Sequence, residues 1–365
     1  MQALDDLRVV DISSSFSGGW CSRMLADFGA TVVMVEPPGG SPVRVLAPFS
    51  PEGESIPAAY VLANKQSVVL NVEDEAERAL VRGLIGRADV LVSSCRPSDL
   101  ARLGLGYEEL ANPALIMVHV TPFGVTGELA EAPGNDLAVA ALSGWASING
   151  LADREPLKPS GWQASYCAGT AAYAAVMAAL HHRDLHPGEG QELDVAEVDV
   201  MAAAFAPAML GAMYSGENRG RRRELDMTGG PVEVADGYFA LTISRAHFWR
   251  DAMNLLGLTD LAEDPRWEPS YYRAAHKDEY VQRVETAMRE WKKMDLFEEL
   301  AARRVVAGPV LNMDDLAANA HLRGRKFWAK PTEAQSSVDY PGPSFRMSET
   351  PWELRTGAPP PGGNS

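Results

Sequence analysis

The sequence predicts an α/β fold in which a large Rossmann-like domain is followed by a smaller α+β domain. Short, β-branched apolar runs alternate with helical patterns in the first half of the chain. Two long Ala-rich helical patterns follow, and a polar basic stretch then separates them from a shorter mixed segment. Near-continuous apolar runs are typical of parallel strands covered on both faces. Their alternation with helices indicates a doubly wound parallel sheet.

The strands and helices are predicted in a regular order. Apolar runs that predict strands occur at residues 8–13, 31–36, 67–72, 89–94 and 115–120. Helical patterns lie between them at 20–28 and 74–86. Long helices are expected at 168–183 and 198–215, separated by "GEGQELDVAE", which predicts a turn and a short strand.

The change of composition at "SGENRGRRREL" predicts a domain linker. We expect a large domain at 1–214 plus 330–365, a linker at 215–226 and a small domain at 227–329. The small domain should hold a strand in "YFALTIS" and helices near 246–256, 277–292 and 294–303. The tail, rich in Pro and Gly, is expected to be extended and to lie over another surface.

Composition excludes several classes of function. The 365 residues are 46% hydrophobic and 22% charged, with a formal net charge of −16, which argues against nucleic-acid binding. Three cysteines without a CxxC pair fit a reducing compartment. The N-terminus lacks the pattern of a signal peptide, and the longest apolar stretch is too short to span a bilayer. A cytoplasmic protein that does not associate with membranes is therefore expected.

The segment "SGWQASYCAGT" (residues 160–170) concentrates reactive side chains at a predicted helix start. It lacks the GxSxG pattern of a hydrolase elbow. Cys167 could be a thiolate stabilised by the helix dipole, but a small buried thiol used in packing is the favoured interpretation. The seven histidines show neither HExxH nor another ligand spacing, so no metal site is expected.

Cations follow several predicted strands. Arg44 follows the second strand, Lys65 precedes the third, and Arg96 and Arg102 follow the fourth. Such a set could bind a polyphosphate through charge-assisted hydrogen bonds, and scattered surface charges are an equally good interpretation. The Gly pair of "SSSFSGGWCSRML" also has two interpretations. It could bind a phosphate through backbone N–H groups, or it could form only a tight turn between a strand and a helix.

A set of motifs runs in order across almost the whole chain: "LDDLRVVDIS", "LADFGATVVMVEPPGGSPVR", "NKQSVVLNV", "ADVLVSSCRPSDLARLGLGYEELANPALIMVHVTPFG", "GEGQELDVAEVD", "ADGYFAL" and "AGPVLNMDDLAANAHLRGR". Taken together, these motifs resemble the class III CoA-transferases, the superfamily of formyl-CoA transferase, carnitine CoA-transferase and α-methylacyl-CoA racemase. The resemblance implies an interlocked dimer whose ligand is coenzyme A or an acyl-CoA thioester, with a carboxylic acid as co-substrate. By motif position it implies CoA contacts at Phe16, Ser17, Leu70, Asn71, Ser94, Cys95, Arg96 and Arg102.

The same resemblance implies an aspartate nucleophile four residues before a Gly that opens a long helix. Here that Gly is Gly169, and the implied position holds Ser165. The racemase branch adds a histidine in the segment that corresponds to "APGNDLAVAALSG", which here has Asn135 and Asp136 instead. Asp136 could be a site acid, a CoA contact or the N-cap of the following helix.

Three hypotheses follow from this departure. The leading one is the Asp-less subunit of a heteromeric CoA-transferase, paired with a homologous chain that carries the aspartate. The second is a homodimeric acyl-CoA enzyme with altered chemistry, of the racemase, lyase or hydrolase kind, using Ser165, Tyr166 or Asp136. The third is a CoA-binding protein without catalysis.

Overall fold

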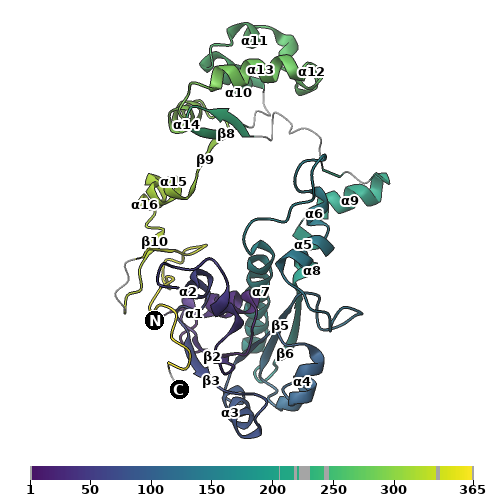
Figure 1. The fold of residues 1–365 in the computed structure, drawn as a ribbon, viewed down its shortest axis with the longest axis vertical. Helices are drawn as coiled ribbons and strands as arrows, with labels where there is room; N and C mark the ends of the chain where they lie inside the picture. The colour runs from purple at the N-terminus through teal and green to yellow at the C-terminus, as the bar shows by residue number, and fades with distance from the viewer. Residues whose placement is uncertain are drawn as a thin grey trace. The chain divides into compact units, whose positions relative to one another are not determined.

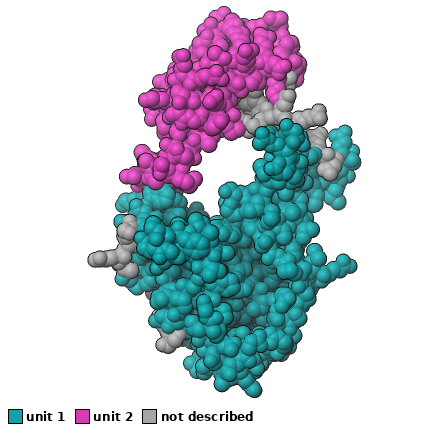
Figure 2. Space-filling view, viewed as in Figure 1, with its two compact units in different colours: residues 1–221, 326–365 teal, residues 222–325 magenta. Residues whose placement is uncertain are grey.

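The computed structural model describes residues 2–204, 206–217, 220–221, 231–241, 246–333 and 338–363. The chain divides into two compact units, residues 1–221 with 326–365 and residues 222–325 (Figure 2). Positions 218–219 and 222–226 of the expected linker lie outside the described residues.

The first unit is built on a six-stranded parallel sheet (Figure 1). The strands run in the order β3-β2-β1-β4-β5-β6, which is the strand order of a doubly wound Rossmann fold. Their bounds are Arg8–Asp11, Thr31–Glu36, Gln66–Val69, Val90–Ser93, Ile116–Thr121 and Gln191–Ala196 for β1 to β6. All five neighbouring pairs are parallel, so the predicted α/β fold class is confirmed.

Helices cover both faces of this sheet because side chains alternate along each strand. On one face, Val9 joins a buried cluster with helices α1 (Phe16–Asp27) and α7 (Gln163–Leu185). On the other face, Val10 joins a second cluster with α3 (Glu75–Ile85) and α4 (Pro97–Leu103). The remaining helices of this unit are α2 (Ile56–Val61), α5 (Asp136–Leu142), α6 (Trp145–Ile148), α8 (Glu197–Ala204) and α9 (Ala206–Ser215), with short 3-10 turns η1 (Pro42–Val45) and η2 (Glu108–Leu110).

Two long helices differ from their predicted bounds. Helix α7 begins five residues before the expected Ala168, so that Ser165 lies in its first turn. The single helix predicted over 198–215 is two helices, α8 and α9. Helix α9 exposes an apolar side: Met209, Leu210, Met213 and Tyr214 are between 46% and 89% exposed.

The second unit has a three-stranded antiparallel sheet in the order β7-β8-β9. Its strands are Pro231–Val234, Gly237–Leu241 and Ala307–Val310, and residues 242–244 of the predicted strand lie outside the described part. The buried Phe239 and Trp249 belong to its own hydrophobic core. Its helices are α10 (Ala246–Leu255), α11 (Thr259–Glu263), α12 (Ser270–Ala275), α13 (Lys277–Met288), α14 (Lys293–Ala302), α15 (Met313–Ala318) and α16 (Ala320–Gly324), with the 3-10 turn η3 (Pro265–Trp267).

The C-terminal tail packs on the first unit. After the short pair β10 (Trp328–Ala329) and β11 (Tyr340–Pro341), residues 351–360 have no regular structure. Trp352 donates its indole N–H to Asp27 Oδ2 at 2.6 Å, and the backbone N–H of Thr356 donates to Asn64 Oδ1 at 2.9 Å. The expected extended tail therefore lies over the end of α1 and the start of β3 in the same chain.

Within the described residues, no single helix is long and apolar enough to cross a membrane. Helices α8 and α9 meet that criterion only as a bent pair, by length and composition alone.

Candidate active site at the carboxyl edge of the sheet

The loops after β1 and β4 meet where the strand order reverses. This switch point is the place where open α/β sheets bind ligands. The backbone N–H of Ser14 donates to Ser94 Oγ at 2.8 Å, which joins the two loops. Ser15 caps α1 by accepting from the Gly18 N–H at 3.1 Å. The structure therefore brings the segment that leads into Phe16 and Ser17 beside Ser94.

Glycines allow the elements around this edge to approach closely. A Cβ on Gly18 would lie 2.5 Å from the Cβ of Ser13. A Cβ on Gly169 would lie 2.5 Å from the backbone oxygen of Ser17 and 3.0 Å from Trp20 Cβ. No side chain fits at that distance, so Gly169 sets how closely α7 approaches α1, one helical turn after Ser165.

Ser165 lies in that first turn and contacts Asp136. It is buried, and its backbone N–H donates to Asp136 Oδ1 at 3.1 Å. The Ser165 hydroxyl lies 3.4 Å from the same carboxylate oxygen. Lys158 donates to Asp136 Oδ2 at 3.3 Å and also to the carbonyl of Gly161 at 2.6 Å. Residues 29 positions apart in the sequence thus form one polar cluster.

The alternative role of Asp136 as an N-cap is wrong. Asn135 caps α5, accepting from the Ala138 N–H at 3.0 Å. Asp136 is the first residue of α5, and its carboxylate turns to Ser165 and Lys158 instead.

Glu197 is a site residue that the sequence reasoning missed. It follows β6 directly, is 3% exposed, and accepts from the Ser17 hydroxyl at 2.5 Å. Burial raises the pKa of Glu197, the Ser17 hydrogen bond lowers it less, and the negative charge of Asp136 raises it further. A buried acid close to a second carboxylate is typical of sites that hold or transfer a proton. The available signal was its place directly after a strand, at the same edge as Ser17.

Aromatic side chains line the site near Ser165. The rings of Phe16 and Trp162 stack at 5.1 Å, and Tyr166 meets Phe16 edge-on at 4.9 Å. Trp20 packs against Tyr166 at 5.0 Å and against Tyr60 at 5.5 Å. Burial raises the pKa of Tyr166, which keeps its phenol protonated. Tyr166 therefore supplies apolar surface and a neutral hydroxyl rather than a base.

Cys167 is exposed, which contradicts the favoured interpretation of a buried packing thiol. Although Cys167 is exposed, the atoms around its sulfur partly desolvate it, and this raises the pKa of the thiol. The negative charge of Asp136 raises the pKa further. A thiol with a raised pKa is a poor nucleophile at neutral pH.

The expected CoA contacts after β3 and β4 lie on neighbouring loops. Leu70 and Cys95 are half-buried against the core on the α3 face, which leaves Leu70 mainly its backbone for a ligand. The backbone N–H of Asn71 donates to Glu77 Oε2 at 2.5 Å. Each of these residues follows a strand at the carboxyl edge of the sheet.

Two of the four candidate cations remain open to solvent. Arg96 donates to Asp99 at 2.9 Å, Arg102 forms two bonds to Glu73 at 2.6 and 2.7 Å, and both arginine side chains are more than half exposed. Exposed pairs of this kind are weak, so either guanidinium could exchange its partner for a phosphate. The other two cations are enclosed by the protein itself.

Lys65 is buried under α1, with its Nζ 3.2 Å from Asp11 Oδ2 and 2.8 Å from the carbonyl of Gly19. Arg44 forms two bonds to Glu36, at 2.6 and 2.7 Å. These pairs stabilise the sheet and the turn into α1.

Comparison with known proteins gives a consistent assignment. The family model of CoA-transferase family III matches residues 4–365. The chain is 34% identical over 370 residues to succinate–glutarate CoA-transferase of Agrobacterium fabrum, covering 98% of this chain and 92% of that protein. It is 35% identical to succinyl-CoA:(R)-benzylsuccinate CoA-transferase subunit BbsE of Thauera aromatica, covering 98% and 91%. The structure of a CaiB/BaiF family protein from Brucella suis superposes with a TM-score of 0.89 at 29% identity, covering 99% and 97%. The chain therefore belongs to CoA-transferase family III, whose chemistry implies CoA thioester and carboxylic acid substrates.

Proposed function

We propose that this chain is the Asp-less subunit of a heteromeric class III CoA-transferase. It binds a CoA thioester at the carboxyl edge of its sheet. A homologous chain supplies the carboxylate that attacks the thioester. The observation that carries this proposal is the serine at position 165.

Position 165 is tied to the site by packing. Gly169 is required where α7 crosses Ser17, and Ser165 lies one helical turn before it. The family resemblance implies a nucleophilic aspartate there. A carboxylate can carry the acyl group as a mixed anhydride and then hold CoA as a thioester. Both intermediates are activated, so CoA can pass from donor to acceptor without hydrolysis of a thioester. A serine hydroxyl would form only an ester, which is a weaker acyl donor.

The name of one relative supports a heteromer. The Thauera protein, 35% identical over nearly the whole chain, is named as a subunit of its transferase. The exposed side of α9 also supports a partner chain, because contiguous exposed apolar side chains mark interaction surfaces. An interlocked pair of homologous chains would cover that side.

The residues of this chain have distinct roles in the proposal. The backbone around Phe16 and Ser17, together with the loops at 70–71 and 94–96, would hold CoA, and Arg102 would face a phosphate. Glu197, with its raised pKa, would hold a proton near the thioester. The partner's carboxylate oxygen would attack the thioester carbonyl, and the CoA thiolate would leave to give the mixed anhydride.

The test compares the lone chain and the co-expressed pair of chains, with succinyl-CoA as donor and glutarate as acceptor. The lone wild-type chain should bind CoA in calorimetry but transfer none. Co-expression with a homologous chain that has aspartate at the aligned position should give transfer. Transfer by the lone wild-type chain would refute the subunit proposal.

Ser165→Asp tests whether only the nucleophile is absent. We expect intact-mass measurement after incubation with succinyl-CoA to show a covalent CoA adduct in this variant. Ser165→Asn is the matched control, because it has the same shape without the carboxylate, and it should form no adduct. Asp136 would raise the pKa of the introduced carboxylate, so the adduct should form faster as the pH rises.

The contact between Ser165 and Asp136 favours a second candidate. With Asp136 Oδ1 3.4 Å from the hydroxyl, a homodimeric enzyme could use Ser165 as an acyl acceptor and Asp136 as its base. In that case the lone chain should turn over acyl-CoA thioesters, and Ser165→Ala should abolish this activity. Activity of the lone chain that survives Ser165→Ala would exclude the role of Ser165.

A further inference from the structure

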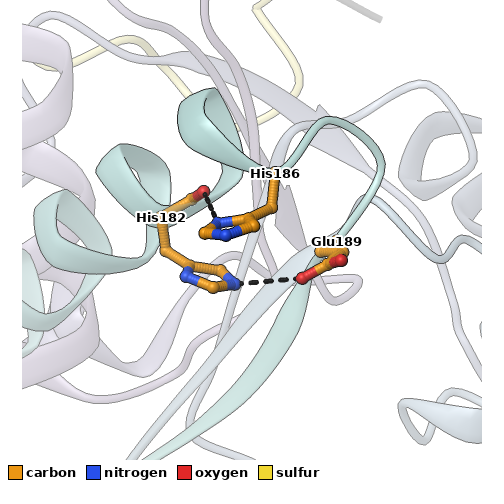
Figure 3. A group of neighbouring side chains, drawn as sticks. All are labelled: His182, His186 and Glu189. Carbon is orange, nitrogen blue, oxygen red and sulfur yellow. Dashed lines mark hydrogen bonds and ion pairs between the residues drawn. The ribbon is translucent and has the colours of Figure 1, made fainter.

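The end of α7 and the turn after it place two imidazoles and a carboxylate together on the surface. Figure 3 shows His182, His186 and Glu189 facing one another. One potential ligand atom of each lies within 4.8 Å of the others. All three residues are exposed, so their side chains can adjust without disturbing the core.

Local structure explains why these residues meet. His182 lies in the last turn of α7 and His186 is the C-cap residue that follows it. The His186 N–H still donates to the His182 carbonyl, and the two rings stack at 4.3 Å. The Glu189 N–H donates to the His186 carbonyl at 3.1 Å, closing a turn over "HPGE". Gly188 has a φ of +90°, and Pro187 precedes it, as a type II turn requires. The turn returns Glu189 to the histidines.

Hydrogen bonding also determines which ring nitrogen can bind a metal. His186 Nδ1 lies 3.1 Å from the His182 carbonyl, which only accepts, so Nδ1 carries the proton and Nε2 is left as a ligand atom. Fixing the tautomer by a backbone carbonyl is the usual arrangement around metal-bound histidines. His182 Nε2 lies 3.2 Å from Glu189 Oε2, so these two ligand atoms already face each other.

We propose that His182, His186 and Glu189 form a binding site for a divalent transition metal of the zinc, nickel or copper class. Tetrahedral coordination at about 2.1 Å places ligand atoms about 3.4 Å apart, which small side-chain rotations can reach from the present separations. The negative end of the α7 dipole favours a cation here. Imidazole ligands select such metals over Mg²⁺ and Ca²⁺, and water would complete the coordination.

The site is distant from the candidate active site. Ser165 and His182 are 17 residues apart on α7, a rise of about 26 Å along the helix. A bound metal would link the last turn of α7 to the segment that enters β6. Its effect is therefore on the stability of this connection and not on transfer chemistry.

The experiment uses the full chain without an affinity tag, stripped of metal with a chelator and titrated with Zn²⁺ by calorimetry. We expect one ion per chain, no competition by excess Mg²⁺, and a higher melting temperature with Zn²⁺. His186→Ala and Glu189→Gln should each weaken Zn²⁺ binding by at least about tenfold. Replacing a residue that only hydrogen-bonds to a metal ligand already weakens binding by about that much. His181→Ala is the control, because His181 is exposed on the same turn but outside the cluster.

Three results would overturn the proposal. One is the absence of Zn²⁺ and Ni²⁺ binding by the wild-type chain. Another is unchanged affinity in both His186→Ala and Glu189→Gln. The third is an equal loss in His181→Ala, which would show general capture by surface histidines. Circular dichroism of the metal-free variants, all altered at exposed positions, verifies that each is folded.

Discussion

Replacing Gly169 by Ala should destabilise the protein, whereas the same change at Gly83 should not. Both glycines lie inside helices, Gly169 in α7 and Gly83 in α3. A Cβ at 169 would meet the Ser17 backbone oxygen at 2.5 Å, and a Cβ at 83 would have no atom within 4 Å beyond its chain neighbours and the backbone of its own helix. The two variants therefore share one chemical change and differ in packing.

The expected free energies of unfolding follow from these distances. Ala in place of Gly stabilises a helix interior by about 1 kcal/mol, which applies at both positions. At 169 the contact is with backbone, which cannot rotate away, so α1 and α7 must separate at a cost of about 2–3 kcal/mol. Gly169→Ala should thus lower the free energy of unfolding by about 1–2 kcal/mol, and Gly83→Ala should raise it by up to about 1 kcal/mol.

Urea unfolding followed by circular dichroism measures the free energy for each variant. Hydrogen exchange of peptides from α1 and α7 localises the effect, which should be concentrated in these two helices for Gly169→Ala. If Gly169→Ala were as stable as Gly83→Ala, the close crossing of α1 and α7 would be refuted. The packing that places the first turn of α7 relative to α1 would be refuted with it.

Three further substitutions test the site. Lys65→Met leaves the buried carboxylate of Asp11 without its counter-ion and should lower the free energy of unfolding, measured in urea, by about 3 kcal/mol. Adding Asp11→Asn should recover part of this loss; no recovery would show that the two residues are not coupled. Glu197→Gln removes a buried acid whose folded pKa is raised, so the wild-type chain loses stability as pH rises from the unfolded pKa of about 4.3 to that folded value. The Gln variant should therefore be the more stable at pH 7 and show less pH dependence, and the opposite order would refute the raised pKa of Glu197. Arg102→Ala should weaken CoA binding about tenfold in calorimetry, while Arg87→Ala, a control just before β4, should leave it unchanged; equal losses would contradict a phosphate contact at Arg102.

Much of the large domain could be predicted because its strands are marked locally. "TVVMVE" coincides with β2 residue for residue, since a strand buried on both faces needs a continuous apolar run. The start of α7 could not be predicted in the same way. "GWQAS" lacks a capping side chain, and Trp162 occupies the N-cap position without a side-chain bond. Packing against α1, rather than local propensity, begins this helix.

The candidate site was only partly predictable for the same reason. Phe16 and Ser94 follow strands, so their meeting at one edge could be expected from the fold. The contact of Ser165 with Asp136 depends on how α5 and α7 pack, which no local pattern encodes. Glu197 has the sequence context of an ordinary acidic residue in a first helical turn. Its place directly after β6 was a weak signal, and the hydrogen bond to Ser17 is what identifies it.

The tail contacts determine when the first part of the fold can be completed. Asp27 and Asn64, near the start of the chain, are bonded to Trp352 and Thr356, and Leu354 is 2% exposed. During translation these groups emerge long before their partners, with the whole second unit made in between. The N-terminal half of the sheet therefore keeps these polar groups without their native partners until residues 352–356 have been made. Removing residues 352–356 would leave Asp27 and Asn64, in the part of the fold that is made first, without these bonds.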